Sequence, residues 1–411
     1  MTRKLLPLLT LLTTLLPGSL LAGQAVLHMP LGDPARSNRE VPLVLDGVTD
    51  TATGELVTPA QLPELLKDTG ILFIGENHTN MDFHEIQYRV IRALRESGRE
   101  VLIGLEMFPY TQQQSLDNWN HGLYTEDGFV ELARWYKYWG YNWGYYRDIF
   151  LFARDNGITM YAINTPRKIV RDVRKKGFEN LTPEEAAALP PQGITPVTDE
   201  QRQMYKAFFD EDDSLHRAIS DEQLEGMFRA QITWDATMGW NALRALERHG
   251  NPDAIMVVMI GAGHVTFGLG SERQIAPHYK GRISSIIPVP VVDDEGTPVE
   301  TVRASYASFI WGVNEETEPK YPVLGVSLMG SLGKNPMQLI QVSKHSVGER
   351  AGLKVGDVLL KMDGDPIESR AALLKKTAGY RWGDVVTLTI LRDGHETDLT
   401  VPFRRTETRQ N

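Results

Sequence analysis

The sequence has no cysteine among its 411 residues. This absence excludes a disulfide scaffold, a zinc knuckle and a thiol nucleophile, and it also excludes a lipid anchor on an amino-terminal cysteine. Basic residues are outnumbered by acidic ones, 43 to 53, which gives a formal net charge of −10. A nucleic-acid-binding protein would normally present a basic face, so no nucleic-acid partner is expected.

A long apolar run is lacking as well. The run at residues 5–16 is shorter than the roughly 20 residues that a membrane span needs, so an integral membrane protein is not expected. Two basic residues precede this run and small residues follow it up to Ala25, which is the order of regions in a secretory signal peptide. We expect residues 1–25 to be a signal peptide, cleaved after Ala25. Gln24 stands where a lipoprotein box would have cysteine, so the mature protein is expected to be periplasmic and not lipid-anchored.

The length of the chain favours two domains, because 411 residues exceed what one hydrophobic core usually supports. The first domain is expected at 26–310, and from residue 71 to about 289 the chain alternates short apolar runs with helical patterns, which is typical of βαβ units and a mostly parallel sheet. A polar acidic stretch at 314–319 is the expected linker to a second domain at 318–405. The predicted fold class is α/β, a mostly parallel sheet with a large helical insertion at about 166–250, followed by a small β-rich domain. The strands predicted for the sheet are 71–75, 101–105, 158–163, 254–260 and 283–287.

Polar side chains follow several predicted strands at the point where each strand ends. These are Glu76 and His78 after the first strand, Glu106 after the second, Asn164 after the third and His264 after the fourth. Because the carboxyl ends of parallel strands meet at one edge of a sheet, we expect these side chains to converge. Two imidazoles and a carboxylate suit a divalent transition metal, with His78, Glu106 and His264 as ligands. Glu76 is then the candidate catalytic base. The alternative is that each histidine is a solvated or capping residue.

A predicted long helix carries a further candidate pocket. Gln231, Trp234 and Asp235 share one stripe of this helix. A buried stripe that contains glutamine and aspartate needs polar partners, because burial without them is costly. We therefore expect these residues to line the pocket. His84 has no comparable context and is expected to be a surface or structural residue.

The segment 135–147 concentrates aromatic side chains. Haem requires a flat apolar slot, an axial donor, for which tyrosine is one ligand, and cations such as arginine for its propionates. Tyr145 and Tyr146 are candidate ligand-binding residues, although the sequence does not assign the axial donor among the tyrosines of the segment. The alternative is that these side chains pack as a cap on the sheet edge.

Four segments near the ends of the predicted strands form recognisable motifs. They are 74–78 (IGENH), 104–107 (GLEM), 162–167 (AINTPR) and 261–265 (GAGHV). In this order they resemble the motifs of the ChaN-like haem-binding uptake family, which belongs to the wider Tiki/TraB/erythromycin-esterase superfamily. The resemblance covers about residues 60–290 and brings Arg167 into the candidate ligand site beside Asn164.

The resemblance implies two different activities. ChaN-like members are described as iron-regulated lipoproteins that bind haem through tyrosine ligation. Other members of the superfamily are metal-dependent proteases and hydrolases, in which two Gly-x-x-His motifs and a glutamate form the active site. This chain departs from the ChaN-like members because it lacks the lipid-anchor cysteine.

Residues from about 320 to 405 resemble a PDZ domain of the bacterial protease-associated type. The segments that carry this resemblance are 324–328 (LGVSL), 351–360 (AGLKVGDVLL) and 385–394 (VVTLTILRDG). A glycine loop lets backbone N–H groups face a peptide carboxylate, and the following strand offers an edge for an added strand. Leu324, Gly325 and Val326 are therefore the expected peptide-binding residues. The alternative is a PDZ fold that is used only for packing.

The sequence thus predicts an exported haem-binding protein associated with iron uptake, with a peptide-binding PDZ module. The rival hypothesis is a metal-dependent hydrolase or peptidase whose PDZ domain recruits the substrate, so whether the protein is an enzyme is left open. The expected partners are haem or another small ligand, a peptide or protein C-terminus and, as an option, a second copy in a homodimer.

Overall fold

The computed structural model describes residues 24–209, 220–293, 296–316, 318–330, 335 and 337–405. Within these residues the chain folds as two compact units: the larger contains residues 24–139 and 143–316, and the smaller contains Gly140–Asn142 and the residues from Glu318 onward. Residues 1–23 of the predicted signal peptide lie outside the described residues. In the described part of the chain, no helix combines the length and the apolarity needed to cross a bilayer.

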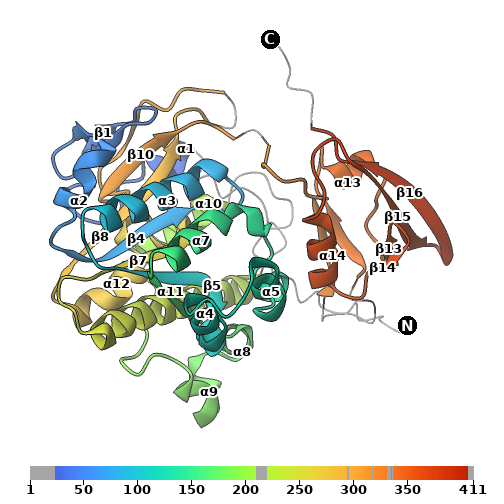
Figure 1. Cartoon of the computed structure of the whole chain (residues 1–411), viewed down its shortest axis with the longest axis horizontal. Coiled ribbons are helices and arrows are strands. Elements are labelled where there is room, and N and C mark those ends of the chain that lie inside the picture. Colours follow the sequence, from blue (N-terminus) through green and yellow to red (C-terminus); the bar gives the residue numbers. More distant parts are fainter. Residues whose placement is uncertain are drawn as a thin grey trace. The chain divides into compact units, whose positions relative to one another are not determined.

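A single eight-stranded sheet forms the centre of the larger unit (Figure 1), with the strand order β3-β2-β10-β8-β4-β7-β5-β6. The strands from β10 to β6 pair in parallel, whereas β2 and β3 are antiparallel additions at one edge. The predicted parallel sheet is therefore confirmed, and it is extended by strands that the sequence did not predict. The strands are β2 (Val48–Asp50), β3 (Glu55–Val57), β4 (Thr69–Glu76), β5 (Val101–Pro109), β6 (Thr159–Asn164), β7 (Ile255–Gly261), β8 (Arg282–Pro290) and β10 (Phe309–Val313).

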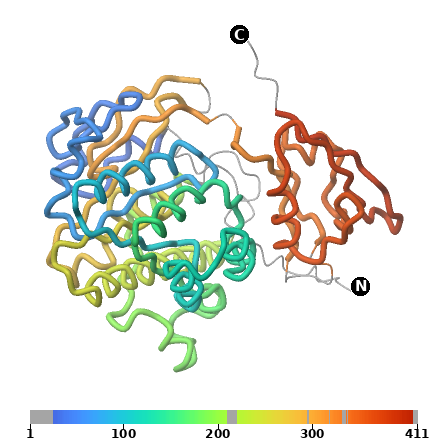
Figure 2. The backbone as a smooth tube through the Cα atoms, in the orientation of Figure 1, coloured from blue at the N-terminus to red at the C-terminus, as the bar shows by residue number. Residues whose placement is uncertain are grey.

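The two ends of the larger unit pair with each other, once in a separate two-stranded sheet and once at the edge of the main sheet. β1 (Glu40–Pro42) pairs with β9 (Thr301–Arg303), and β2 pairs with β10. Figure 2 shows these blue and orange segments running side by side. The contacts are distant in sequence, which explains why local patterns did not reveal these short strands.

Helices cover the sheet on both faces. α3 (Met81–Glu96) and α7 (Arg147–Asp155) lie in front of the sheet in Figure 1. α11 (Asp221–His249) packs Met238 and Leu243 into one core with Ile71 and Phe73 of β4. Successive residues of a strand point to opposite faces of the sheet. Ile71 and Phe73 therefore lie on the face that α11 covers, and the residues next to them in β4 lie on the opposite face. The remaining helices of this unit are α1 (Gln24–Leu27), α2 (Leu62–Leu65), α4 (Gln113–Asn120), α5 (Glu126–Leu132), α6 (Trp135–Tyr138), α8 (Arg167–Lys176), α9 (Pro183–Ala187), α10 (Asp199–Phe209) and α12 (Ser271–Ile275).

The long helix α11 has clear start and stop signals. Ser220 accepts a hydrogen bond from the backbone N–H of Gln223, and the Gln223 side chain completes a capping box. Gly250 ends the helix with a φ of 79°, a conformation that glycine adopts at no steric cost. Together with α8 and α10, this helix forms the insertion that the sequence predicted between β6 and β7.

The smaller unit is β-rich, as expected for a PDZ fold. Its four-stranded sheet has the order β14-β13-β15-β16, and β11 pairs with β12 in a separate ribbon. Asp393 and Gly394 both have a positive φ and close a two-residue hairpin between β15 and β16, as the Asp-Gly pair predicts. The elements are β11 (Val326–Leu328), β12 (Leu339–Val342), α13 (Val347–Arg350), β13 (Val358–Met362), β14 (Asp365–Pro366), α14 (Arg370–Thr377), β15 (Val385–Arg392) and β16 (His395–Pro402).

Candidate functional site

The polar residues predicted at the strand ends do converge at the carboxyl edge of the parallel sheet. Glu76 is the last residue of β4, Asn164 is the last residue of β6, and His264 ends the short 3₁₀ turn that follows β7. Glu106 lies inside β5, because this strand continues to Pro109. Asn164 Nδ2 donates to the backbone oxygen of Glu106 at 2.8 Å, which ties neighbouring strands together at this edge.

Glu76 and His78 form the first carboxylate–imidazole pair. Nδ1 of His78 lies 2.8 Å from Oε1 of Glu76, and since a carboxylate only accepts hydrogen bonds, Nδ1 carries the proton. Tyr146 donates to the same oxygen at 2.7 Å, and Gln87 donates to Oε2 at 2.6 Å. The Glu76 side chain has no exposed surface. An orienting role for Glu76 suits this geometry better than that of a general base, which needs access to a substrate proton.

The charge state of this first pair follows from its surroundings. Burial opposes ionisation of Glu76, but the imidazoles of His84 and His78 and the Tyr146 hydroxyl outweigh it and lower the pKa to about 2. Burial also disfavours the charged form of His78. The hydrogen bond that His78 donates to Glu76 and the nearby charge of Glu106 outweigh that effect, so the pKa of His78 is raised.

Asp235 and His264 form a second pair of the same design. Nδ1 of His264 lies 2.6 Å from Oδ1 of Asp235 and 2.8 Å from Nε2 of Gln231. Tyr205 donates to the other Asp235 oxygen at 3.2 Å. Burial lowers the pKa of His264, but Asp235 and Glu106 outweigh it, so the net shift is upward. Of the predicted helix stripe, Gln231 and Asp235 therefore contact His264, and the ring of Trp234 lies edge-on to it at 6.3 Å.

Glu106 faces both pairs. Its Oε1 lies 3.6 Å from Nε2 of His264, and its Oε2 accepts the backbone N–H of Gly261 at 2.7 Å. A Cβ atom on Gly261 would lie 3.2 Å from Cε1 of His78 and 3.6 Å from Oε2 of Glu106. Glycine at this position thus lets the imidazole, the carboxylate and the backbone approach closely. Two imidazoles that favour the charged form and one carboxylate are available here for proton transfer or for binding an anion.

The donors at this edge do not form a complete metal site. Nε2 of His264 and Oε1 of Glu106 are separated by a distance that two ligands of one ion could have. Within the part of the chain that the structure describes, however, no group of three or more histidine, aspartate or glutamate residues is arranged to hold a metal ion. The predicted ligands His78, Glu106 and His264 therefore lie near one another, but they are not arranged around a single metal position.

Most of the aromatic segment packs as a cap. Tyr146 is fully buried and Tyr145 is 4% exposed. Trp135 and Trp143 pack edge-to-face at 4.9 Å, and Phe150 contacts both rings. These contacts favour the packing alternative for this part of the segment. The two tyrosines named as candidate ligands lie inside this cluster, where Tyr146 supports the Glu76 carboxylate.

One end of the segment remains accessible. Trp139 packs edge-on against His78 at 4.8 Å, and its neighbour Tyr138 is only partly buried. Arg167, the first residue of α8, donates to the backbone oxygen of Tyr138 at 2.9 Å, and Nζ of Lys137 lies 5.7 Å from the centre of the Tyr138 ring. Both cations are exposed. A phenol and two cations therefore flank the carboxyl edge.

Two residues of this network were not predicted. His84 is buried, with Nδ1 3.6 Å from Oε2 of Glu76, although the sequence assigned it to the surface or to a structural role. Burial lowers its pKa, so the neutral imidazole is favoured. Its position on the apolar stripe of α3, beside Phe83 and Ile86, was the available signal. Tyr205 lies on α10, and no local pattern pointed to its contact with Asp235.

The predicted peptide-binding loop has the geometry of a tight turn before an open strand. Gly325 has a φ of 69°, and a Cβ there would come within 2.3 Å of Ser346, so glycine is required. Leu324 is buried in the core of the smaller unit and Val326 begins β11. Among the described residues β11 pairs only with β12, which leaves its other edge without a strand partner.

Comparisons with known proteins agree with the motif assignments. The model of the family described as haem-binding uptake, Tiki superfamily, ChaN matches residues 62–275, just over half of the chain, and the PDZ model matches residues 322–403. The chain is 26% identical to RETICULATA-RELATED 5 of Arabidopsis thaliana over 50% of this chain and 28% of that protein. It is 34% identical to the periplasmic serine endoprotease DegP of Escherichia coli over 17% of this chain and 15% of that protein. The chain thus spans well under a third of the length of these relatives.

A similar solved structure is that of ChaN of Campylobacter jejuni with cofacially bound haem. It shares 16% identity and a TM-score of 0.49, over 66% of this chain and 98% of that one.

Proposed function

Because the chain belongs to the haem-binding uptake family of the Tiki superfamily, that of ChaN, we propose that the protein is an exported haem-binding protein associated with iron uptake. Its PDZ domain binds a peptide segment or a protein C-terminus. The observation that carries the haem proposal is the position of Tyr138, a partly exposed tyrosine whose backbone oxygen accepts a hydrogen bond from the exposed Arg167 and whose ring lies 5.7 Å from Nζ of the exposed Lys137.

The residues at this edge fit the needs of haem. Bound haem would supply its iron for ligation by a tyrosine oxygen, as the family resemblance implies. Tyr145 and Tyr146 are buried and Tyr146 is hydrogen-bonded to Glu76. Of the partly buried tyrosines of the segment, we assign the axial oxygen to Tyr138, because the exposed Lys137 and Arg167 contact it. Lys137 and Arg167 would hold the propionates, because guanidinium and ammonium groups pair well with carboxylates.

The histidines add to the anion affinity of this edge. The pKa of His78 is raised, mainly by Glu76 against the opposing effect of burial, so its cationic form persists closer to neutral pH. Trp139, the neighbour of Tyr138 in the chain, is 8% exposed and packs edge-on against His78. The cationic and aromatic groups at this edge therefore suit a ligand that is flat, apolar and doubly negative, as haem is.

Titration of the full-length protein with ferric haem tests this proposal. We expect a Soret band whose position reports the axial ligand, and we expect Tyr138→Phe to shift the band and weaken binding at least tenfold. Tyr88→Phe is the matched control, because Tyr88 is also partly buried on the larger unit but lies on α3. A folded protein without a Soret band, or a Tyr138→Phe variant that binds like the control, would contradict the proposal.

The PDZ part of the proposal rests on the Gly325 turn and the open edge of β11. A peptide with a free C-terminal carboxylate should bind more tightly than its C-terminally amidated form, because backbone N–H groups of the loop would face the carboxylate. Fluorescence anisotropy with both labelled peptides measures the difference. Equal affinity for the two forms would contradict recognition of a C-terminus.

A metal-dependent hydrolase or peptidase is the second candidate function. The observation that favours it is that His78 and His264 each pair through Nδ1 with a carboxylate, as metal-ligating imidazoles usually do. Metal analysis of the purified protein tests it, with His78→Ala and His264→Ala as variants. Stoichiometric metal that both variants lose would favour the hydrolase, whereas a metal-free protein that binds haem would favour the first proposal.

A further inference from the structure

A cavity lies where the loop at residues 32–36 meets α12, the strand β8 and the loop between β9 and β10. Its volume is about 240 Å³, and one molecule of liquid water occupies about 30 Å³, so the cavity has room for a small organic molecule. None of the residues of the carboxyl-edge cluster lines it. The lining residues that matter here are Asp33, Arg36, Phe267, Leu269, Glu272 and Ser305.

Glu272 has no protein partner in this cavity. Among the described residues its carboxyl group forms no hydrogen bond or ion pair. Burial raises the pKa of Glu272 to about 7, against the lowering effect of Arg36, and Asp33 adds to the rise. The Glu272 side chain is only partly buried and lines the cavity, so a ligand that enters the cavity can reach this unpaired carboxyl group.

Ser305 is a second, independent polar group without a partner. It is 2% exposed, and within the described part of the chain its hydroxyl finds no hydrogen-bond partner. The cavity therefore has a carboxyl group and a hydroxyl group that both lack donors, next to the apolar side chains of Phe267 and Leu269.

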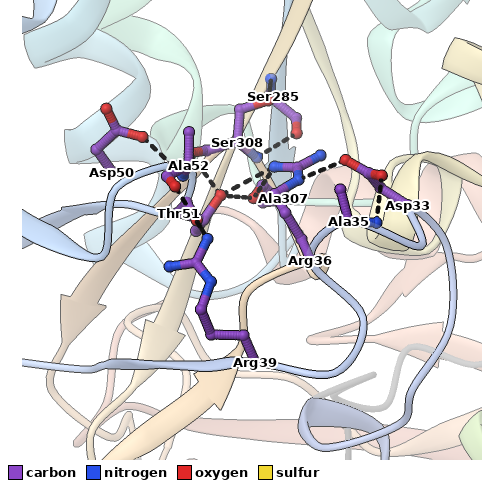
Figure 3. Close-up of polar contacts among 10 residues, drawn as sticks. All are labelled: Asp33, Ala35, Arg36, Arg39, Asp50, Thr51, Ala52, Ser285, Ala307 and Ser308. Atoms are coloured by element: carbon purple, nitrogen blue, oxygen red, sulfur yellow. Dashed lines mark hydrogen bonds and ion pairs between the residues drawn. The ribbon is translucent and has the colours of Figure 1, made fainter.

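The two arginines near Glu272 form hydrogen bonds with other residues. Figure 3 shows the Arg36 guanidinium directed towards Asp33 and Thr51: Nε donates to Asp33 at 2.8 Å, and Nη1 donates to Thr51 at 3.0 Å. Arg273 donates to the side chain of Gln201 at 2.6 Å. Neither arginine forms an ion pair with Glu272.

The charges that line the cavity favour a cation. Asp33, Glu200 and Glu272 supply three negative charges when all are ionised, and Arg36 and Arg273 supply two positive charges, so the lining carries one excess negative charge. A metal ion fits less well, because the described residues contain no group of three carboxylates or imidazoles arranged around one position.

We propose that this cavity binds a small primary ammonium ion. The ammonium nitrogen donates hydrogen bonds to the carboxylate of Glu272 and to the hydroxyl of Ser305, and a short apolar tail packs against Phe267 and Leu269. This site is distinct from the haem edge, and it does not depend on the function proposed there.

The proposal makes the affinity depend on pH. With a pKa of about 7, Glu272 is largely ionised at pH 8 and largely protonated at pH 6, whereas an alkylammonium stays charged at both. Only the ionised carboxylate attracts the ligand, so binding should be roughly tenfold tighter at pH 8 than at pH 6. The other charged groups around Glu272 are Asp33 and Arg36 across the cavity, Arg273 on the same helix and Glu200 on α10.

Calorimetric titration of the full-length protein with n-propylammonium chloride tests the site. Tetramethylammonium is the control ligand, because it has the same charge but no N–H donors. Glu272→Gln should weaken propylammonium binding at least tenfold and remove its pH dependence, whereas the matched control Glu64→Gln, an exposed glutamate, should bind like the parent protein.

Ser305→Ala separates binding from folding. Because its hydroxyl has no protein partner, the variant should keep or raise the melting temperature while it binds propylammonium several-fold more weakly. Equal binding of the two ammonium ions, unchanged affinity in Glu272→Gln, or a folded parent protein that does not bind propylammonium at pH 8 would each overturn the proposal.

Discussion

The two histidines at the carboxyl edge are held in the same way but by different sequence relations. His78 pairs with Glu76, two positions earlier, whereas His264 pairs with Asp235, 29 positions earlier on α11. In each pair a tyrosine hydroxyl also donates a hydrogen bond to the carboxylate. The same local chemistry is thus built once within a strand-end motif and once by packing a long helix against the sheet.

The pairs also differ in access. The side chain of His78 is 24% exposed and that of His264 is 9% exposed. A ligand at this edge therefore reaches His78 more readily, whereas His264 sits deeper beside Glu106 and Gln231. We expect changes around His264 to affect mainly the stability of the fold, and changes around His78 to affect both stability and ligand binding.

Replacing Asp235 with alanine should give the largest effect. The change removes the carboxylate that both the buried His264 imidazole and the Tyr205 hydroxyl contact, which should lower the free energy of unfolding by about 3–5 kcal/mol. Urea denaturation of the full-length protein measures the loss. Asp253→Ala, at an exposed position in a loop, is the control. If Asp235→Ala lowered the free energy of unfolding no more than this control, the Asp235–His264 pair would not be the stabilising one of the two pairs.

Glu76→Gln should have the next largest effect. It keeps the shape of the side chain but removes the charge, so it should cost about 2–3 kcal/mol of unfolding free energy, because buried donors lose a charged acceptor. The pKa of His78 should also fall, since the Glu76 carboxylate is a cause of its upward shift. NMR titration of the His78 ring checks this, and an unchanged pKa would mean that Glu106 alone maintains it.

The tyrosines behind the carboxylates allow a finer comparison. Tyr146 donates to Glu76 at 2.7 Å and Tyr205 donates to Asp235 at 3.2 Å. Since shorter charge-assisted hydrogen bonds are stronger, Tyr146→Phe should destabilise by about 1.5 kcal/mol and Tyr205→Phe by about 1 kcal/mol or less. Thermal denaturation of both variants ranks them, and the reverse order would show that packing rather than the hydroxyl dominates.

The pH dependence should be the smallest effect, and its sign differs among the histidines. The pKa values of His78 and His264 are raised by their carboxylates against burial, so their stabilising contribution is present below pH about 6.5 and is lost as pH rises through the raised values. Burial lowers the pKa of His84, so it destabilises the fold as pH falls below that range. NMR titration should find His84 titrating below the other two. A common midpoint for all three would contradict the assigned contacts.

Part of the carboxyl edge was predictable because its residues lie at the ends of strands that the sequence indicated. Apolar runs rich in isoleucine and valine indicated β4 and β7, and Glu76, His78 and His264 followed from where those strands stop. The three-residue strands β1, β2 and β3 were not predicted, because they are too short for a period. β1 and β2 also depend on distant partners, β9 and β10, and β3 depends on β2. The candidate ligand pocket around Tyr145 and Tyr146 looked plausible from composition, although both side chains are buried.

The sequence by itself determined the two-unit organisation, the parallel sheet and the polar residues that come to its carboxyl edge, because strand periods and turn residues act over short distances. The tertiary structure alone decided which donor reaches which acceptor. His84 and Tyr205 enter the network, and Glu272 is left without a partner, because burial and distance depend on how α3, α10 and α12 pack against the sheet. The same packing sets the shifts in pKa, since desolvation and neighbouring charges act through space rather than along the chain.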